Sequence, residues 1–284
     1  MSEIIRKISV IVNPLKDDAR SILHEMESYF SAKGIELDVQ SIDEELRAAD
    51  LRGVELAISL GGDGTLLYCA RACLLENIPI LAVNLGKFGF ITEITSTEWI
   101  QTYEKFVEGK LGISERIMIS AKVIRNRETI AELVGLNDAV IGTVGVSRLI
   151  ELNLFLARSY VGRYRADGVI VSTPTGSTAY SMGAGGPILH PEMEAFILNP
   201  ICPFTLSNRP LVVPAEEDIE LELERADRTE AVLTVDGQRP FHLNTGDRIT
   251  FQALPQKSLI IRSDRRNFYE VLRSKLNWSG EPHA

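Results

Sequence analysis

The chain has 284 residues, and at roughly 150 residues per domain this length predicts two domains. Hydrophobic residues make up 45% and charged residues 24%, a composition that excludes a disordered chain. Because 39 Asp and Glu residues outnumber 30 Lys and Arg residues, the net charge of −9 argues against nucleic acid or an anionic membrane surface as a main partner. No apolar run approaches the roughly 18 residues of a membrane span, and the N-terminus does not have the pattern of a secretory signal, so we expect a cytoplasmic protein.

Strand and helix patterns alternate over residues 1–113. Apolar residues between 22 and 30 repeat on one face of a helix, and Gly34 is placed to end it in the left-handed conformation. Thr95 and Glu98 are spaced as a capping box. In chain order we expect a strand over 8–12, this first helix, a strand over 35–39, a short helix over 43–50, a buried strand over 54–60, a helix over 66–76, a strand over 80–84 and a helix over 99–107.

After Gly112 the pattern changes to short strand-like segments separated by turns, with a hairpin connection at 125–127. A final helix over 267–278 is expected to pack back on the first domain. The predicted fold is an N-terminal doubly wound α/β domain over 1–113, completed by 264–284, followed by a β-sandwich-like domain over 114–263. Its strands are expected over 117–124, 129–136, 139–141, 149–157, 219–223, 231–235, 248–254 and 258–261.

The cysteines are few and are not spaced as a metal site. Cys69 and Cys73 are one helical turn apart, with no nearby Cys or His to complete a zinc set. We expect both to be reduced thiols of the core, where cysteine is usually buried.

The first candidate site is the sequence GGDGT at residues 61–65, between a predicted strand and a predicted helix. Glycines let a backbone approach a phosphate closely, and a helix N-terminus offers unpaired N–H groups and positive potential. Asp63 beside such a site would take or orient the proton of an attacking hydroxyl, as phosphoryl transfer requires. The alternative is a tight turn that only caps a helix. Neither a Walker P-loop nor a GxGxxG fingerprint is present.

The second candidate site is the segment 167–187, in which Gly, Ser and Thr make up more than half of the residues. Hydroxyls and exposed N–H groups bind phosphate or sugar oxygens, and Tyr180 offers a flat ring to a base. A long surface loop is the alternative. Smaller signals are Asn137-Asp138, suited to a ribose diol, the turn at 235–238, and Arg163 with Arg165, which either neutralise phosphate or are simply paired.

Taken in order, these motifs resemble the NAD kinase family. They are GGDGT at 61–65, NLGKFGFI at 84–91, Asn137-Asp138, DGVIVSTPTGSTAY at 167–180, AGGPI at 184–188, PICPFTLSNRP at 200–210 and VDGQ at 235–238. GGDGT also occurs in diacylglycerol and sphingosine kinases, whereas STPTGSTAY followed by AGGPI is more specific. The resemblance implies ATP-dependent phosphorylation of the 2′-hydroxyl of the adenosine ribose of NAD, which gives NADP.

The resemblance also implies roles for individual residues. Asp63 resembles the proton acceptor, Gly64 part of the phosphate turn, and Asn137 with Asp138 the pair that binds ribose hydroxyls, with Asp where the family usually has Glu. Gly183 stands where the family often has Ser, and Phe204 where it commonly has His. The substrate-binding residues implied are Asp63, Gly64, Phe90, Asn137, Asp138, Arg148, Arg165, Asp167, Thr178, Ala179, Tyr180, Gly183, Cys202 and Gln238.

The implied partners are NAD and ATP, with Mg²⁺ carried by the ATP phosphates rather than by protein ligands. In the family, the segment containing Cys202 approaches the substrate across a subunit interface, so the resemblance implies a homodimer or homotetramer. Two alternatives remain at this point: a lipid kinase of the diacylglycerol type and a non-catalytic NAD(P)-binding regulator. The lipid kinase would require an apolar or basic membrane-binding surface.

Overall fold

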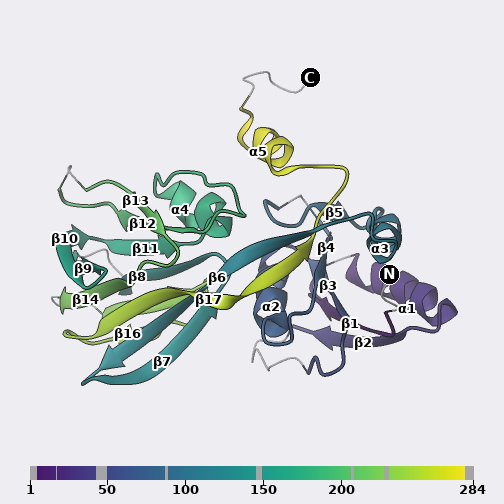
Figure 1. The fold of residues 1–284 in the computed structure, drawn as a ribbon, viewed down its shortest axis with the longest axis horizontal. Helices are drawn as coiled ribbons and strands as arrows, with labels where there is room; N and C mark the ends of the chain where they lie inside the picture. Colours follow the sequence, from purple (N-terminus) through teal and green to yellow (C-terminus); the bar gives the residue numbers. More distant parts are fainter. Residues whose placement is uncertain are drawn as a thin grey trace. The chain divides into compact units, whose positions relative to one another are not determined.

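The computed structural model describes residues 5–16, 18–42, 50–86, 89–144, 149–205, 208–226 and 230–278. The chain forms two compact units, one of residues 1–115 with 257–284 and one of residues 116–256 (Figure 1). The predicted helix over 43–50 lies almost entirely outside the described residues. Within them, no helix is both long and apolar enough to cross a membrane.

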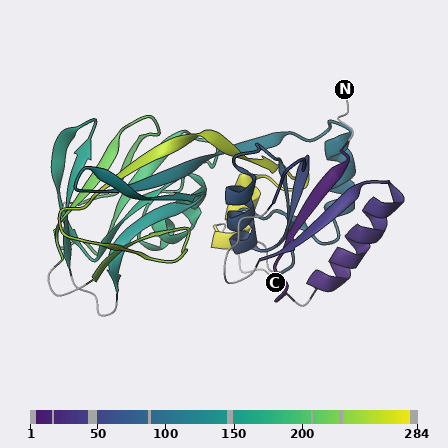
Figure 2. The same ribbon diagram turned by 90° about the horizontal axis from the view of Figure 1, so that it is seen from below.

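The first unit is built on a parallel sheet with strand order β2-β1-β3-β4-β5. Alternate side chains of β1, β3 and β4, such as Val10, Ile58 and Val83, form one core cluster with α1 and α3. Figure 2 shows α2 on the opposite face of the sheet from α1. Helices therefore cover both faces, as predicted for a doubly wound domain. The elements are β1 (Lys7–Val12), α1 (Ala19–Ala32), β2 (Glu36–Ser41), β3 (Leu56–Gly61), α2 (Asp63–Cys73), β4 (Ile80–Asn84), β5 (Ile94–Thr95) and α3 (Trp99–Val107).

Helix ends in this unit agree with the sequence in some places and differ in others. Gly34 follows α1 with a φ of +70°, the left-handed conformation predicted for it. α2 begins at Asp63 rather than at residue 66, because Gly62 is the extended N-cap and the chain becomes helical directly after it. Glu98 accepts a hydrogen bond from the Thr95 N–H, half of the predicted capping box, but it is itself the residue before α3.

The second unit is a sandwich of two sheets, as predicted. One has the order β13-β12-β11-β8-β15-β16, and the other contains β10-β9-β14-β17 together with β6 and β7. Inward side chains of both sheets, Ile141 and Phe196 from the first and Leu221 and Phe251 from the second, share one core. The strands are β6 (Ile113–Arg125), β7 (Glu128–Gly135), β8 (Asp138–Val144), β9 (Ile150–Leu156), β10 (Ser159–Ala166), β11 (Gly168–Ser172), β12 (Ala195–Ile201), β13 (Leu211–Pro214), β14 (Ile219–Arg225), β15 (Glu230–Val235), β16 (Phe241–Leu243) and β17 (Arg248–Ile261).

Two connections in this unit are informative. The hairpin between β6 and β7 turns at Asn126 and Arg127, both with positive φ, as a two-residue turn between twisted strands requires. The prediction of separate strands over 248–254 and 258–261 is wrong, because β17 is continuous. Pro255 lies within it, and the fixed φ of proline is compatible with an extended strand.

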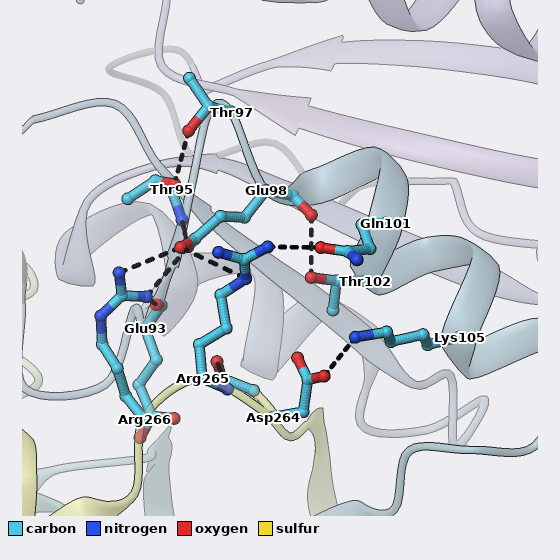
Figure 3. A network of polar contacts seen from close by, with 11 residues as sticks. Glu93, Thr95, Thr97, Glu98, Gln101, Thr102, Lys105, Asp264, Arg265 and Arg266 are labelled. Carbon is cyan, nitrogen blue, oxygen red and sulfur yellow. Dashed lines mark hydrogen bonds and ion pairs between the residues drawn. The ribbon is translucent and has the colours of Figure 1, made fainter.

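The C-terminal segment is held against α3 by charged side chains (Figure 3). Arg266 donates to both carboxylate oxygens of Glu98, at 2.9 and 3.0 Å, and to the carbonyl of Glu93 at 3.0 Å. These bonds from Arg266 lower the pKa of Glu98 to about 2. The following helix, α5 (Phe268–Leu276), begins with a complete capping box between Asn267 and Glu270. The C-terminal helix thus belongs to the first unit, as predicted.

Candidate functional site

The GGDGT sequence places Asp63 at the first position of α2, where β3 ends. The carboxyl ends of the strands are where open α/β sheets bind their ligands. Gly61 is required here, because a Cβ at this position would lie 2.1 Å from the Thr65 hydroxyl oxygen. Gly64 is exposed and a side chain there would meet open space. The motif therefore presents a carboxylate and an uncovered glycine at a helix N-terminus.

The Asp63 carboxylate is held by the segment that follows β4. Its Oδ2 accepts the Phe90 N–H at 3.0 Å, and its Oδ1 accepts the Thr92 N–H at 3.2 Å and the Thr92 hydroxyl at 2.8 Å. Gly89 lies so close that a Cβ there would be 1.7 Å from Oδ1. Two of the sequence motifs thus converge on one side chain, which is partly exposed.

In the second unit, Asp138 is the first residue of β8 and Asn137 directly precedes it, and both are buried. The carboxylate of Asp236 accepts the N–H groups of Leu136 at 2.9 Å and Asn137 at 2.8 Å, with a longer bond of 3.3 Å from Asp138. Asp236 and Gly237 both have positive φ in the turn after β15. The VDGQ motif is therefore a turn, and its carboxylate fixes the backbone of the Asn-Asp pair.

Asp138 has an unusual electrostatic environment. It is 6% exposed, and burial, with the nearby Asp236 carboxylate as the second cause, raises the pKa of Asp138 to about 7. The Oδ1 atom of Asn137 is buried and has no hydrogen-bond partner among the described residues. A buried amide oxygen beside an acid that titrates near neutrality is suited to binding hydroxyl groups of a ligand.

The segment 167–187 is not a surface loop. It contains a 3₁₀ turn (Thr175–Thr178) and the short helix α4 (Tyr180–Gly183). Five of its hydroxyl-bearing residues are buried: Thr173, Thr175, Ser177, Thr178 and Ser181. The Thr173 N–H donates to the Asn137 carbonyl at 2.8 Å, so this segment packs directly on the Asn-Asp pair. The Thr175 hydroxyl is buried and, like the Asn137 amide oxygen, has no partner among the described residues.

The other predicted site residues have varied surroundings. Arg148 lies outside the described residues. Arg165 is exposed, stacks on the Phe204 ring with its guanidinium 4.6 Å from the ring centroid, and lies 3.9 Å from a Glu151 carboxylate oxygen. Arg163 is paired with Glu151 and Glu224, which favours the alternative that this arginine only forms ion pairs and does not neutralise a phosphate. Of the rest, Tyr180, Gly183 and Cys202 are exposed, and Asp167, Ala179 and Gln238 are half-buried.

The sequence alone did not single out Asn84, Thr92, Asp236 or Gly176 as part of the site. Asn84, Asp236 and Gly176 stand inside motifs already noted, and Thr92 directly follows one, which is the signal available in the sequence. Gly176 is packed so tightly that a Cβ would lie 2.1 Å from the Asn137 carbonyl oxygen. The thiols of Cys69 and Cys73 are free and buried, as predicted, whereas Cys202 is exposed. Among the described residues, no group of three or more His, Cys, Asp or Glu side chains is placed to hold a metal ion.

Comparison with known proteins decides the family. The ATP-NAD kinase N-terminal domain matches residues 9–111, and the ATP-NAD kinase C-terminal domain matches residues 136–263. An NAD kinase of Treponema denticola is 41% identical over 277 residues, which cover 97% of this chain and 98% of that protein. The chain belongs to the NAD kinase family. An NAD kinase of Citrifermentans bemidjiense is 38% identical over 285 residues, covering 96% of this chain and 99% of that protein.

Solved structures agree with this assignment. The yeast NADH kinase complexed with NADH superposes with a TM-score of 0.85 at 22% identity, over 99% of this chain and 90% of that one, and shows the fold. An NAD kinase from Archaeoglobus fulgidus in complex with ATP has a TM-score of 0.73 at 25% identity, over 94% of this chain and 99% of that one. The predicted family, fold class and NAD kinase activity are thereby confirmed, and neither the lipid kinase nor the non-catalytic regulator is favoured.

Proposed function

We propose that this NAD kinase transfers the γ-phosphoryl group of ATP to the 2′-hydroxyl of the adenosine ribose of NAD, with Asp63 as the group that accepts or orients the hydroxyl proton. The observation that carries this role is the placement of Asp63 at the N-terminus of α2, partly exposed, with its carboxylate held by the N–H groups of Phe90 and Thr92. A hydroxyl is a poor nucleophile near neutral pH, and a fixed carboxylate addresses that weakness.

The dinucleotide would be held mainly by residues of the sequence motifs that resemble those of the NAD kinase family. Asn137 and Asp138 would bind ribose hydroxyls, because the buried Asn137 amide oxygen accepts hydrogen bonds and Asp138 can accept them when ionised. Asp167 would lie near the nicotinamide end. Walls of the site would be formed by Phe90, Thr178, Ala179 and Tyr180, with further ligand contacts from Gly64, Arg148, Arg165, Gly183, Cys202 and Gln238.

A divalent cation, Mg²⁺ in the simplest case, would enter with ATP. The described residues contain no cluster of three ligating side chains, so its ligands would be phosphate oxygens and water. When bound, the cation would neutralise charge on the transferring phosphoryl group. The chain's own residues would position the acceptor hydroxyl and receive its proton.

We also propose that the protein acts in the cytoplasm as a homodimer or homotetramer, in which the segment containing Cys202 reaches a neighbouring subunit's substrate. Its support is the exposure of Cys202 and Phe204, and of apolar residues on two strands at sheet edges: Tyr160 and Val161 on β10, and Leu211 and Val212 on β13. Sedimentation of the active enzyme tests this, because a fully active monomer would contradict the cross-subunit role.

The activity is tested with purified protein, NAD, ATP and Mg²⁺. The product is detected with a dehydrogenase specific for NADP, which distinguishes NADP from NAD by the 2′-phosphate. Diacylglycerol is offered as the acceptor in a parallel reaction. NADP formation with no lipid phosphorylation supports the proposal. Binding of NAD without turnover, with ATP or with inorganic polyphosphate, would make the chain a regulator instead.

A further inference from the structure

Asp63 is the end point of a buried chain of hydrogen bonds that begins at Asn84, the last residue of β4. The Asn84 amide nitrogen lies 2.7 Å from the Thr92 hydroxyl oxygen, which lies 2.8 Å from Asp63 Oδ1. Thr92 is fully buried and Asn84 is 4% exposed, so water does not compete for these bonds.

The direction of every proton in this chain follows from its partners. Asn84 Oδ1 accepts the Gly86 N–H at 2.7 Å, which places the amide nitrogen toward Thr92. Because that nitrogen can only donate, the Thr92 oxygen must accept from it. The single proton of the Thr92 hydroxyl is then directed at Asp63 Oδ1.

The two carboxylate oxygens of Asp63 are consequently not equivalent. Oδ1 receives two donors from Thr92, its hydroxyl and its N–H, which use both lone pairs of that oxygen. Oδ2 receives one donor from the described residues, the Phe90 N–H. A proton placed on Oδ1 would face two donors, whereas Oδ2 keeps a lone pair for a further hydroxyl.

We propose that Asn84 and Thr92 are positioning residues that reserve Oδ2 of Asp63 as the atom that receives the substrate proton. This inference rests on the proposed function. In the step, the 2′-O–H bond of NAD breaks and its proton passes to Oδ2, while the 2′-oxygen forms a bond to the γ-phosphorus of ATP. The bond between that phosphorus and the bridging oxygen breaks, ADP leaves with the electron pair, and the proton is later released to water.

The test compares three variants with the wild type in the NADP-formation assay. Thr92→Val removes the hydroxyl and keeps the branched shape, and Thr92→Ser restores a hydroxyl at the same place. Thr102→Val is the matched control, since Thr102 is a buried threonine of the same unit whose hydroxyl donates to the Glu98 carbonyl at 2.9 Å (Figure 3). Circular dichroism and thermal unfolding establish that each variant is folded.

We expect Thr92→Val to lower kcat by about tenfold or more with the KM for NAD within about twofold of the wild type, because the carboxylate is misplaced while the dinucleotide contacts remain. Thr92→Ser should recover most of the lost kcat, and Thr102→Val should keep it. If Thr92→Val does not fold, Asn84→Asp replaces it: an acceptor at 84 turns the Thr92 proton away from Asp63, so kcat should fall and KM should stay.

The kinetic results separate the positioning role from the proposed function. A wild type that makes NADP while Thr92→Val, or Asn84→Asp in its place, keeps wild-type kcat overturns the positioning role and leaves the proposed function standing. An equal loss in Thr92→Val and Thr102→Val also overturns it, since any buried hydroxyl would then matter. A wild type that makes no NADP overturns both.

Discussion

Replacing Asp138 with asparagine should make the free energy of unfolding less dependent on pH between pH 3.8 and about pH 7. The folded pKa of Asp138, about 7, lies above its ordinary value of 3.8, because the site is buried and Asp236 is near. A group with a raised folded pKa stabilises the fold fully below its unfolded pKa, and this contribution is lost as the pH rises through the folded pKa. The gap of about 3 pH units, at about 1.4 kcal/mol per unit, makes the ionised side chain cost about 4 kcal/mol.

The part of this cost that falls between about pH 5.5 and pH 8.5 is about 2 kcal/mol, because the loss ends near pH 7. Asparagine has almost the same shape and does not ionise, so the difference between the two proteins isolates Asp138 from all other titrating groups. The assay is urea unfolding of wild type and Asp138→Asn at both pH values. The free energy of unfolding of the wild type should fall relative to the variant by about 2 kcal/mol. If the free energies of unfolding of wild type and Asp138→Asn changed equally between the two pH values, ionisation of Asp138 would not destabilise the fold.

Three further predictions concern single contacts, and each free-energy change is measured by urea unfolding. The KM for NAD in the second is measured by the NADP-formation assay. Arg266→Ala should lower the free energy of unfolding by about 2 kcal/mol, because it removes two charge-assisted hydrogen bonds to Glu98. Since the folded pKa of Glu98 is lowered to about 2, this loss should be present above pH 4.5 and shrink on acidification. A loss that does not depend on pH would contradict this explanation. Asp236→Ala should raise the KM for NAD and cost about 2 kcal/mol, because three backbone N–H groups lose their acceptor, and an unchanged KM would show that the turn does not shape the ribose site. Gly176→Ala should cost about 2 kcal/mol through a 2.1 Å clash, whereas Gly162→Ala, which meets open space, should cost little; equal effects would exclude the clash as the cause.

The sequence predicts most of this fold because its signals are local. The apolar run before GGDGT, the left-handed Gly34 and the hairpin at 125–127 each depend on neighbouring residues, and each has its expected structure. The break predicted within β17 shows the limit of this reasoning. A proline usually interrupts a strand, but pairing with β14 before Pro255 and with β4 after it keeps β17 extended.

The candidate site is less predictable because its contacts join residues far apart in the chain. Asp63 stands out in the sequence, but its partner Thr92 is 29 positions away, and nothing local marks a threonine as a donor to that carboxylate. The same holds for Asp236 and Asn137, which are 99 positions apart. The burial that raises the pKa of Asp138 likewise results from the packing of two segments and has no signature in Asn-Asp itself.

The most direct test of the central claim is the kcat for NADP formation by Asp63→Asn, which keeps the shape of the side chain and removes the proton acceptor. Asp218→Asn, whose side chain bonds Gln252 in the second unit, serves as the matched control. The account predicts a loss of about 100-fold or more in kcat for Asp63→Asn, with NAD binding retained and the control unchanged. A kcat for Asp63→Asn within about threefold of the wild type would contradict the role assigned to Asp63, because a positioned proton acceptor contributes about 100-fold or more.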